Sequence, residues 1–235
     1  MNNYFENHPS FKKMWSLDLY TLSYVREKSE KEIWKYLNKN LEILEIGFWA
    51  WGFTEVCKNK WIKKYTWIDI DWFFLDSLQK RHPEYKFKII SFLEFLKEKI
   101  EKYDLIYMSH VFEHLDEKER KGCIKLIYQS LKKWGVWINY MPNCESIIES
   151  CKFRYYDLTH KTSYCPHSFE QLLNENITNY KIIHLNSYVW TWIFFKRLIY
   201  LFFLNMTKIY WKWMWRSFPK INTWEFISII KKNEK

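Results

Sequence analysis

Three histidines stand close to acidic residues in two short segments of the sequence. The segment YDLIYMSHVFEHL contains His110, Glu113 and His114, and the segment RYYDLTHK contains Asp157 and His160. An imidazole gains and loses a proton near neutral pH, so a positioned histidine can remove a proton from a substrate hydroxyl group. His160, which follows Asp157 by three residues, is the first candidate for a general base, and His110 is the second.

Metal binding is a second use that these side chains could have. Glu113 and His114 could bind a divalent ion, but two adjacent residues are too few for a metal site, and the start of a helix favours an acidic residue in any case. The cysteines are odd in number, scattered and without a C-x-x-C pair: Cys57, Cys123, Cys144, Cys151 and Cys165. This spacing suggests neither a zinc site nor a disulfide framework. We therefore expect no bound metal.

The elements that would hold these residues follow from the hydrophobic pattern. After an amphipathic stretch at about 23–38, short apolar runs alternate with helical stretches. The pattern predicts strands at 41–46, 64–70, 86–90, 103–109, 136–141, 180–187 and 225–232, and helices near 53–60, 73–81, 92–101, 116–132 and 168–174. Such alternation forms right-handed βαβ crossovers. We predict a Rossmann-like, doubly wound α/β fold with a mostly parallel seven-stranded sheet and helices on both faces.

A single domain is expected, because 235 residues are an ordinary domain size. The hydrophobic and charge pattern divides this domain further. It predicts an N-terminal helical segment before the first strand at 1–40, a loop and helix on the substrate side at 143–176, and an insertion rich in aromatic and basic residues at 188–220. Lys196 and Arg197 interrupt the longest apolar run of the insertion, which leaves fewer than the ~20 apolar residues of a membrane span. We predict an amphipathic helix that lies either on a membrane surface or on the protein's own core.

The charge and the N-terminus suggest where the protein works. A formal net charge of +10 at pH 7 favours an anionic partner. The first residues lack the apolar region of a secretion signal. We expect a cytoplasmic protein that attaches peripherally to the inner face of the membrane.

Glycine is scarce and tryptophan abundant in this chain. It has 4 Gly and 15 Trp, whereas an average domain of this length has roughly 16 Gly. Several tryptophans stand where a backbone turn favours glycine: Trp49, Trp51, Trp67 and Trp134. We hypothesise that these positions are UGA codons, which some bacterial lineages read as glycine. The alternative is a protein that is truly rich in tryptophan.

A predicted strand followed by a turn, ILEIGFWAWGFT, gives the strongest functional signal. With glycine at 49 and 51 it would read ILEIGFGAGGFT, which resembles the first motif of class I S-adenosylmethionine-dependent methyltransferases, E/D-x-G-x-G-x-G. Missing side chains let such a turn bend sharply and approach a ligand closely. The resemblance implies S-adenosyl-L-methionine as the cofactor, with Glu45 orienting it.

Later segments resemble the same family in the same order. Asp69 lies 22 residues beyond Gly47, where a strand-end carboxylate accepts hydrogen bonds from both ribose hydroxyls, and Asp71 is the alternative. Ser91 and Phe92 stand at the position that contacts adenine in the family, and LKKWGVWINYMPN resembles its fifth-strand region. The resemblance implies a cofactor site formed by Glu45, Gly47, Trp49, Trp51, Asp69, Ile70, Ser91, Phe92 and Ser109.

The stretch RYYDLTHKTSYCPHSFEQLL resembles an R-Y-x-D-x-T-H segment found in a bacterial methyltransferase subfamily that is linked to cell-envelope saccharide and lipid-like substrates. The resemblance implies that Arg154 and Thr159 contact the acceptor and that Asp157 and His160 act in catalysis. Ser168 is better explained as a helix cap. Because the stretch follows the fifth strand, it can lie over the carboxyl edge of the sheet, where open α/β folds bind ligands.

Together these features predict methyl transfer from S-adenosyl-L-methionine to a small-molecule, saccharide or lipid-linked acceptor, at a hydroxyl group. An RNA or protein methyltransferase is an alternative that the positive charge favours, but no N-P-P-Y-like tetrapeptide follows the fourth strand, so a nucleic acid is the weaker candidate. A non-catalytic membrane-surface or nucleic-acid-binding module that keeps the fold is a further alternative, and it fits better if the tryptophans are genuine.

Overall fold

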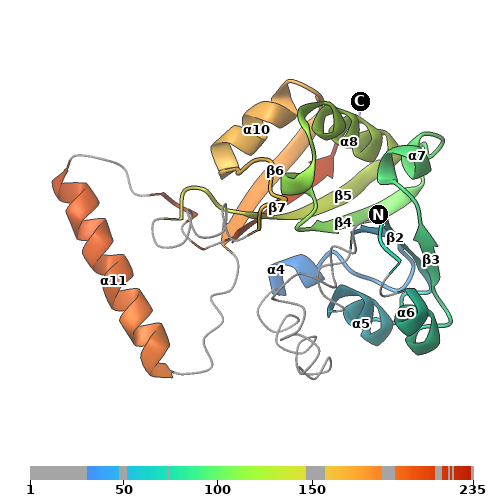
Figure 1. Cartoon of the computed structure of the whole chain (residues 1–235), viewed down its shortest axis with the longest axis horizontal. Helices are drawn as coiled ribbons and strands as arrows, with labels where there is room; N and C mark the ends of the chain where they lie inside the picture. Colours follow the sequence, from blue (N-terminus) through green and yellow to red (C-terminus); the bar gives the residue numbers. More distant parts are fainter. Residues whose placement is uncertain are drawn as a thin grey trace.

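The computed structural model describes residues 31–47, 52–72, 75–146, 157–186, 194–214, 219–221, 223 and 225–233. Its strands form one sheet in the order β3-β2-β1-β4-β5-β7-β6 (Figure 1). They are β1 Glu42–Ile46, β2 Lys64–Asp69, β3 Lys86–Ile89, β4 Tyr103–Ser109, β5 Leu131–Pro142, β6 Tyr180–Asn186 and β7 Glu225–Lys232. β1 to β5 run parallel, and β7 pairs antiparallel with both β5 and β6. The predicted doubly wound, mostly parallel seven-stranded sheet is confirmed.

Helices cover both faces of this sheet. The covering helices are α4 Lys31–Trp34, α5 Gly52–Asn59, α6 Leu75–Arg81, α7 Phe92–Leu96, α8 Glu117–Ser130 and α10 Pro166–Asn174. A short 3-10 helix, η1, spans Phe112–His114, and a further helix, α11, spans Phe194–Trp213. Apolar residues of α4, α5 and α6 share one buried cluster with the sheet. Those of α7, α8 and α10 share a second cluster with it. The α/β alternation read from the sequence therefore corresponds to two layers of helices around one sheet.

Alternating residues of the central strand β4 belong to these two clusters. Leu105 and Tyr107 are buried in the cluster under α5, and Ile106 and Met108 are buried in the cluster under α8. Successive side chains of a strand point to opposite faces, so a strand that is covered on both faces is apolar throughout. The continuous apolar run that predicted this strand has this origin.

Two helices begin with reciprocal caps that their sequences encode. Asp116 caps α8, and the side chain of Glu119 returns the bond to the Asp116 backbone. At α10 the N-cap is Cys165, and Ser168, two residues into the helix, accepts a hydrogen bond from the Cys165 backbone N–H at 3.0 Å. We expected Ser168 to be the N-cap residue, and this expectation is wrong. The N-cap lies three residues earlier, at Cys165, because Pro166 already occupies the first helical position.

Other boundaries also differ from the predictions. The predicted helix at 92–101 ends at Leu96. β5 begins at Leu131 rather than at 136, because Leu131 pairs with Tyr103 before the register moves to Val136 opposite Leu105. Residues 132–135 therefore loop out of the ladder between β4 and β5. Of the predicted lead-in helix at 23–38, the structure describes α4 and the few residues after it.

The tryptophans fall into two conformational groups. Trp61 and Trp134 have positive φ values of 58° and 64°, and both side chains are exposed. This left-handed region favours glycine, and Trp61 follows the end of α5 at a position where helices often end in glycine. Trp67 is instead a buried residue of the extended strand β2, so its backbone does not require glycine. Trp49 and Trp51 lie outside the described residues.

The helix α11 stands apart from the sheet and its covering helices (Figure 1). Many of its large apolar side chains are exposed: Leu198, Ile199, Leu201, Phe202, Phe203, Met206, Ile209, Tyr210 and Trp213. None of these residues belongs to either buried cluster, which disfavours the reading in which the segment packs on the protein's own core. In the described part of the chain, no helix has the length and apolar character to cross a bilayer.

Candidate active site

The turn after β1 lies against the end of β2. Gly47 has a φ of +80°, and its N–H donates to the carbonyl of Ile68 at 2.9 Å. A Cβ at this position would lie 2.1 Å from Cγ2 of Val111, so no other residue fits here without displacing Val111. Asp69, which follows Ile68, is buried at the end of β2. Gly47 and Asp69, predicted as cofactor residues from separate motifs, therefore lie at one edge of the sheet.

Glu45 is held from inside the protein. Its carboxylate accepts hydrogen bonds from the hydroxyl of Tyr65 and, at 3.4 Å, from Oγ1 of Thr54. Burial raises the pKa of Tyr65, and the negative charge of Glu45 raises it further. Tyr65 therefore remains a neutral donor that fixes the orientation of the Glu45 carboxylate.

Three other predicted cofactor residues lie along the same edge of the sheet. The side chain of Ile70, directly after β2, is exposed and open to contact by a ligand. Ser91 precedes α7, and its neighbour Phe92 is buried in the apolar cluster under α8. Phe92 can therefore offer a ligand its backbone rather than its ring. The predicted contacts themselves remain predictions.

Past the end of β4, the chain adopts a strained conformation at His110. Its φ is 54°, an uncommon value for a residue with a side chain. The ring is held by two carboxylates: Nδ1 lies 3.1 Å from Oε1 of Glu113 and Nε2 lies 2.8 Å from Oε2 of Glu225. Ser109, just before it, has a buried Oγ with no hydrogen-bond partner among the described residues.

The pairing with two carboxylates sets the charge of this buried group. Burial alone would lower the pKa of His110, but hydrogen bonds to Glu113 and Glu225 raise it to about 9. Burial would raise the pKa of Glu113, and the hydrogen bond from His110 outweighs that effect and lowers it. At neutral pH the pair is therefore an imidazolium and a carboxylate, which suits His110 better for donating hydrogen bonds than for removing a proton.

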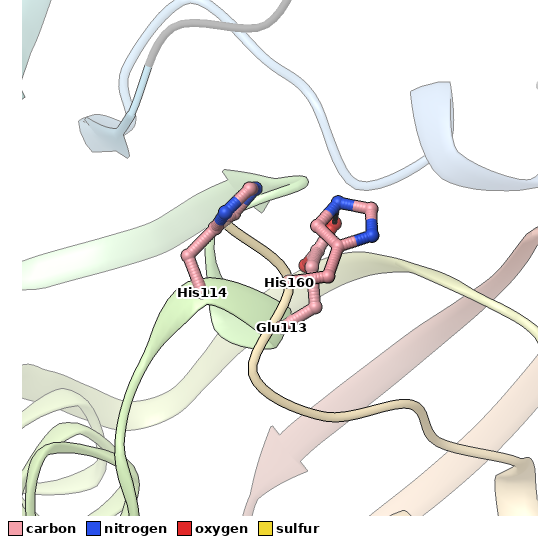
Figure 2. Close-up of side chains that lie close together, drawn as sticks. All are labelled: Glu113, His114 and His160. Atoms are coloured by element: carbon pink, nitrogen blue, oxygen red, sulfur yellow. Dashed lines mark ion pairs between the residues drawn. The ribbon is translucent and has the colours of Figure 1, made fainter. Parts of the chain in front are cut away.

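Figure 2 shows Glu113 and His114 of η1 facing His160 from the segment that precedes α10. The rings of His114 and His160 lie 4.7 Å apart, and Nε2 of His160 lies 3.9 Å from both Oε1 of Glu113 and Oδ2 of Asp157. The backbone carbonyl of Glu113 accepts hydrogen bonds from the N–H groups of Lys161 and Thr162 at 2.9 and 3.3 Å. These bonds fasten the two segments together.

Thr159 links Asp157 to His114 within this cluster. Its hydroxyl donates to Oδ1 of Asp157 at 2.7 Å and lies 2.8 Å from Nδ1 of His114. Burial lowers the pKa of His114, so its ring is neutral at neutral pH. The structure thus brings together every predicted catalytic residue, with Thr159 beside them. Arg154, the other predicted substrate contact, lies outside the described residues.

Glu225 is the residue of this site that the sequence analysis missed. It begins β7, 115 residues beyond His110, and no motif in the sequence connects the two. Its position follows from the insertion of β7 beside β5, where Glu225 pairs with Pro142 at the carboxyl end of that strand.

Comparisons with known proteins bear on the fold of this chain. Residues 53–137 match the family model described as "Methyltransferase domain". This part of the chain is therefore similar to a methyltransferase domain. No curated protein matches the sequence.

Solved structures of methyltransferases share the fold of this chain. A SAM-dependent methyltransferase from Archaeoglobus fulgidus aligns with a TM-score of 0.64 at 20% identity over 95% of this chain and 98% of its own. A chain from the complex between the Haloferax volcanii Trm112 methyltransferase activator and the putative methyltransferase aligns with a TM-score of 0.67 at 7% identity over 100% of both chains. A putative S-adenosylmethionine-dependent methyltransferase from Listeria monocytogenes gives a TM-score of 0.59 at 13% identity, over 89% of this chain and 99% of its own.

S-adenosyl-L-methionine is the cofactor that the sequence motifs imply, and the described residues fit it. Gly47 begins the turn after β1 with a positive φ of +80°, a backbone conformation that glycine adopts readily and that glycine-rich cofactor turns use. Asp69 lies at the adjacent strand end, from which a carboxylate reaches ribose hydroxyls. Ile70 offers an exposed apolar side chain beside it.

Proposed function

We propose that this protein methylates a hydroxyl group of a small-molecule, saccharide or lipid-linked acceptor. The observation that carries the proposal is the group of imidazoles and carboxylates that gathers beyond the carboxyl end of β4 (Figure 2). Gly47, after β1, and Asp69, at the end of β2, lie at the same edge of the sheet, one and two strands away from β4 respectively. A methyl donor held at β1 and β2 and an acceptor held beside β4 would thus meet at the edge where open α/β sheets bind ligands.

Each residue of the cluster has a distinct task in this proposal. S-adenosyl-L-methionine supplies an activated methyl group on a sulfonium. A hydroxyl acceptor must be placed in line with that group and must lose its proton. Nε2 of His160 lies 3.9 Å from the Asp157 carboxylate, which would stabilise the ring once it has gained the proton. His110, held between Glu113 and Glu225, would position the acceptor side of the site.

Methyl transfer from labelled S-adenosyl-L-methionine to a panel of polyols, saccharides and lipid-linked saccharides tests the proposal. The assay is run on the parent chain and on the Trp49→Gly/Trp51→Gly variant. We expect His160→Ala to lower turnover on the order of 10²-fold, as for a lost general base, without changing cofactor affinity. His167→Ala, an exposed histidine of α10, is the matched control.

Two results would change the assignment. Unchanged turnover in His160→Ala, together with a loss in His110→Ala, would move the role of the base to His110. Transfer to RNA or to a protein, with none to any hydroxyl acceptor of the panel, would replace the proposed acceptor class with the alternative.

We also propose that α11 attaches the enzyme to an anionic membrane surface. Its exposed apolar side chains share the helix with Lys208 and Lys212, which are exposed as well. A helix with this combination binds at the headgroup boundary through apolar burial and through attraction to anionic lipids. Such attachment would bring the active site near an amphiphilic acceptor and would make the protein peripheral at the inner face of the membrane.

A further inference from the structure

Glu113, His114 and His160 each offer one ligand atom, and these atoms lie within 4.8 Å of one another (Figure 2). We propose that these three side chains bind a divalent transition-metal ion, with Zn²⁺ or Mn²⁺ as the expected occupants. Two imidazoles and one carboxylate form a ligand set that leaves coordination positions open for water or substrate. Among the described residues, this is the one group of three or more such side chains close enough to share an ion.

The hydrogen bonds around His114 select the tautomer that a metal ligand needs. The single hydroxyl proton of Thr159 is donated to Asp157 Oδ1. Nδ1 of His114, 2.8 Å from the same hydroxyl oxygen, must therefore be the donor to Thr159. The proton of the neutral ring lies on Nδ1, and Nε2 carries the lone pair. Metal-binding histidines are oriented in this way, with the second nitrogen donating to a carboxylate or to a polar group linked to one.

Glu113 supplies the negative charge, and its geometry leaves one oxygen for an ion. The residue is fully buried. Oε1 contacts His110 Nδ1 at 3.1 Å, whereas Oε2 has no hydrogen-bond partner among the described residues. A buried carboxylate oxygen without a partner is unfavourable. A cation shared with the two imidazoles would satisfy it.

The ligand atoms of the three side chains must move slightly closer together to bind an ion. Ligand atoms about 2.1 Å from a tetrahedral ion lie roughly 3.4 Å from one another, against the 4.8 Å limit within which these atoms lie. His160 can supply the movement by rotating its side chain, because it is less buried than Glu113. The backbone bonds of Lys161 and Thr162 to Glu113 would keep both segments in place meanwhile.

The role of the ion rests on the proposed function, although its binding does not. An acceptor hydroxyl bound to the ion would lose its proton to water more readily, because the ion stabilises the oxyanion. The C–S bond of the sulfonium then breaks as the O–CH₃ bond forms, and S-adenosylhomocysteine leaves uncharged. His160 would act as a ligand in the ion-bound protein and as the base in its absence. The favoured acceptors are those with adjacent hydroxyls, which can chelate the ion.

Binding is tested on the full chain without cofactor, by calorimetry with Zn²⁺ and by electron paramagnetic resonance with Mn²⁺. We expect one ion per chain, at least tenfold weaker binding in His114→Ala and in His160→Ala, and unchanged binding in His167→Ala. Thr159→Val, which removes the support of His114, should weaken binding about 10- to 100-fold. Circular dichroism identifies any variant that fails to fold. The variants that do fold then show whether these side chains bind the ion.

Binding that is equally strong in all variants, or no stoichiometric binding, overturns the proposal. Activity is measured separately, before and after removal of the ion with a chelator. Unchanged methyl transfer by the metal-free protein would overturn the catalytic role of the ion while leaving the proposed methylation intact. Specific ion binding without methyl transfer to any hydroxyl acceptor supports the site and overturns the proposed function.

Discussion

At the scale of single residues, the contact between His110 and its two carboxylates has a measurable effect on stability. The folded protein raises the pKa of this ring from 6.5 to about 9. A raised pKa means that the stabilisation is complete below pH 6.5 and is lost as the pH rises through 9. The shift corresponds to at most about 3 kcal/mol.

We therefore predict that the free energy of unfolding falls between pH 6.5 and pH 9, and that the His110→Gln variant lacks this part of the decline. Urea unfolding at a series of pH values measures it. His167→Ala controls for loss of an exposed histidine and should keep the slope. An identical slope in His110→Gln would show that other groups titrate in this range.

The two tryptophans with a left-handed backbone conformation, Trp61 and Trp134, lead to a second prediction. Trp61→Gly and Trp134→Gly should each stabilise the protein by about 1 kcal/mol, because a residue with a side chain is unfavourable at positive φ. Trp67→Gly should instead destabilise it by about 3 to 5 kcal/mol, because Trp67 fills the core. Thermal unfolding compares the three variants.

Destabilisation in all three would mean that tryptophan is the proper residue at these positions. Sequencing the codons is an independent check, since the hypothesis of recoded glycine requires UGA at 61 and 134. Trp67 lies in an extended strand and not at a positive φ, so the hypothesis for Trp61 and Trp134 holds whichever codon encodes Trp67.

Among the elements, α11 is the one that the fold of the domain does not explain. We predict that the protein floats with vesicles of anionic lipid and that binding weakens as salt is added, because each basic residue near the surface contributes about 1 kcal/mol. Replacing Phe202 and Phe203 with serine should reduce flotation strongly. Lys125→Ser on α8, away from α11, is the control.

Failure to bind such vesicles would contradict the proposal that α11 attaches the protein to a membrane. In that case the exposed apolar face of α11 would need another partner to cover it. Flotation on neutral vesicles alone would contradict the role given to Lys208 and Lys212.

The alternation of apolar strands and amphipathic helices predicted β1 to β4, α5 and α8 to within about two residues, because each buried strand is continuously apolar. The early start of β5 was missed, because Lys132, Lys133 and Trp134 loop out of the ladder and do not look like a strand. The contact of His110 with Glu225 was missed for a different reason. It depends on where β7 enters the sheet, and local periodicity carries no information about strand order.

For the whole molecule, cofactor binding and folding are linked. A ligand that binds the folded state alone stabilises it by about 2.7 kcal/mol at a concentration 100 times its Kd. We predict that S-adenosyl-L-methionine raises the melting temperature, and that Asp69→Ala, which weakens binding by about 1.5 to 3 kcal/mol, reduces the shift at the same concentration.

Asp71→Ala is the matched control, because Asp71 is the neighbouring carboxylate and its backbone N–H donates to Asp69. A full thermal shift in Asp69→Ala with a reduced shift in Asp71→Ala would exchange their roles. No shift in the parent chain, with a clear shift in the Trp49→Gly/Trp51→Gly variant, would show that the indoles obstruct the turn.

The position of β7 between β5 and β6 has a consequence for how the protein is made. A ribosome delivers β6 before β7, yet among the strands that the structure describes β6 pairs with β7 alone. A nascent chain that ends before Glu225 would therefore carry an uncovered edge on β5 and an unattached β6, both prone to bind other chains. It would also lack one of the two carboxylates that hold His110. Translation of the last strand would complete the sheet and the active site in a single step.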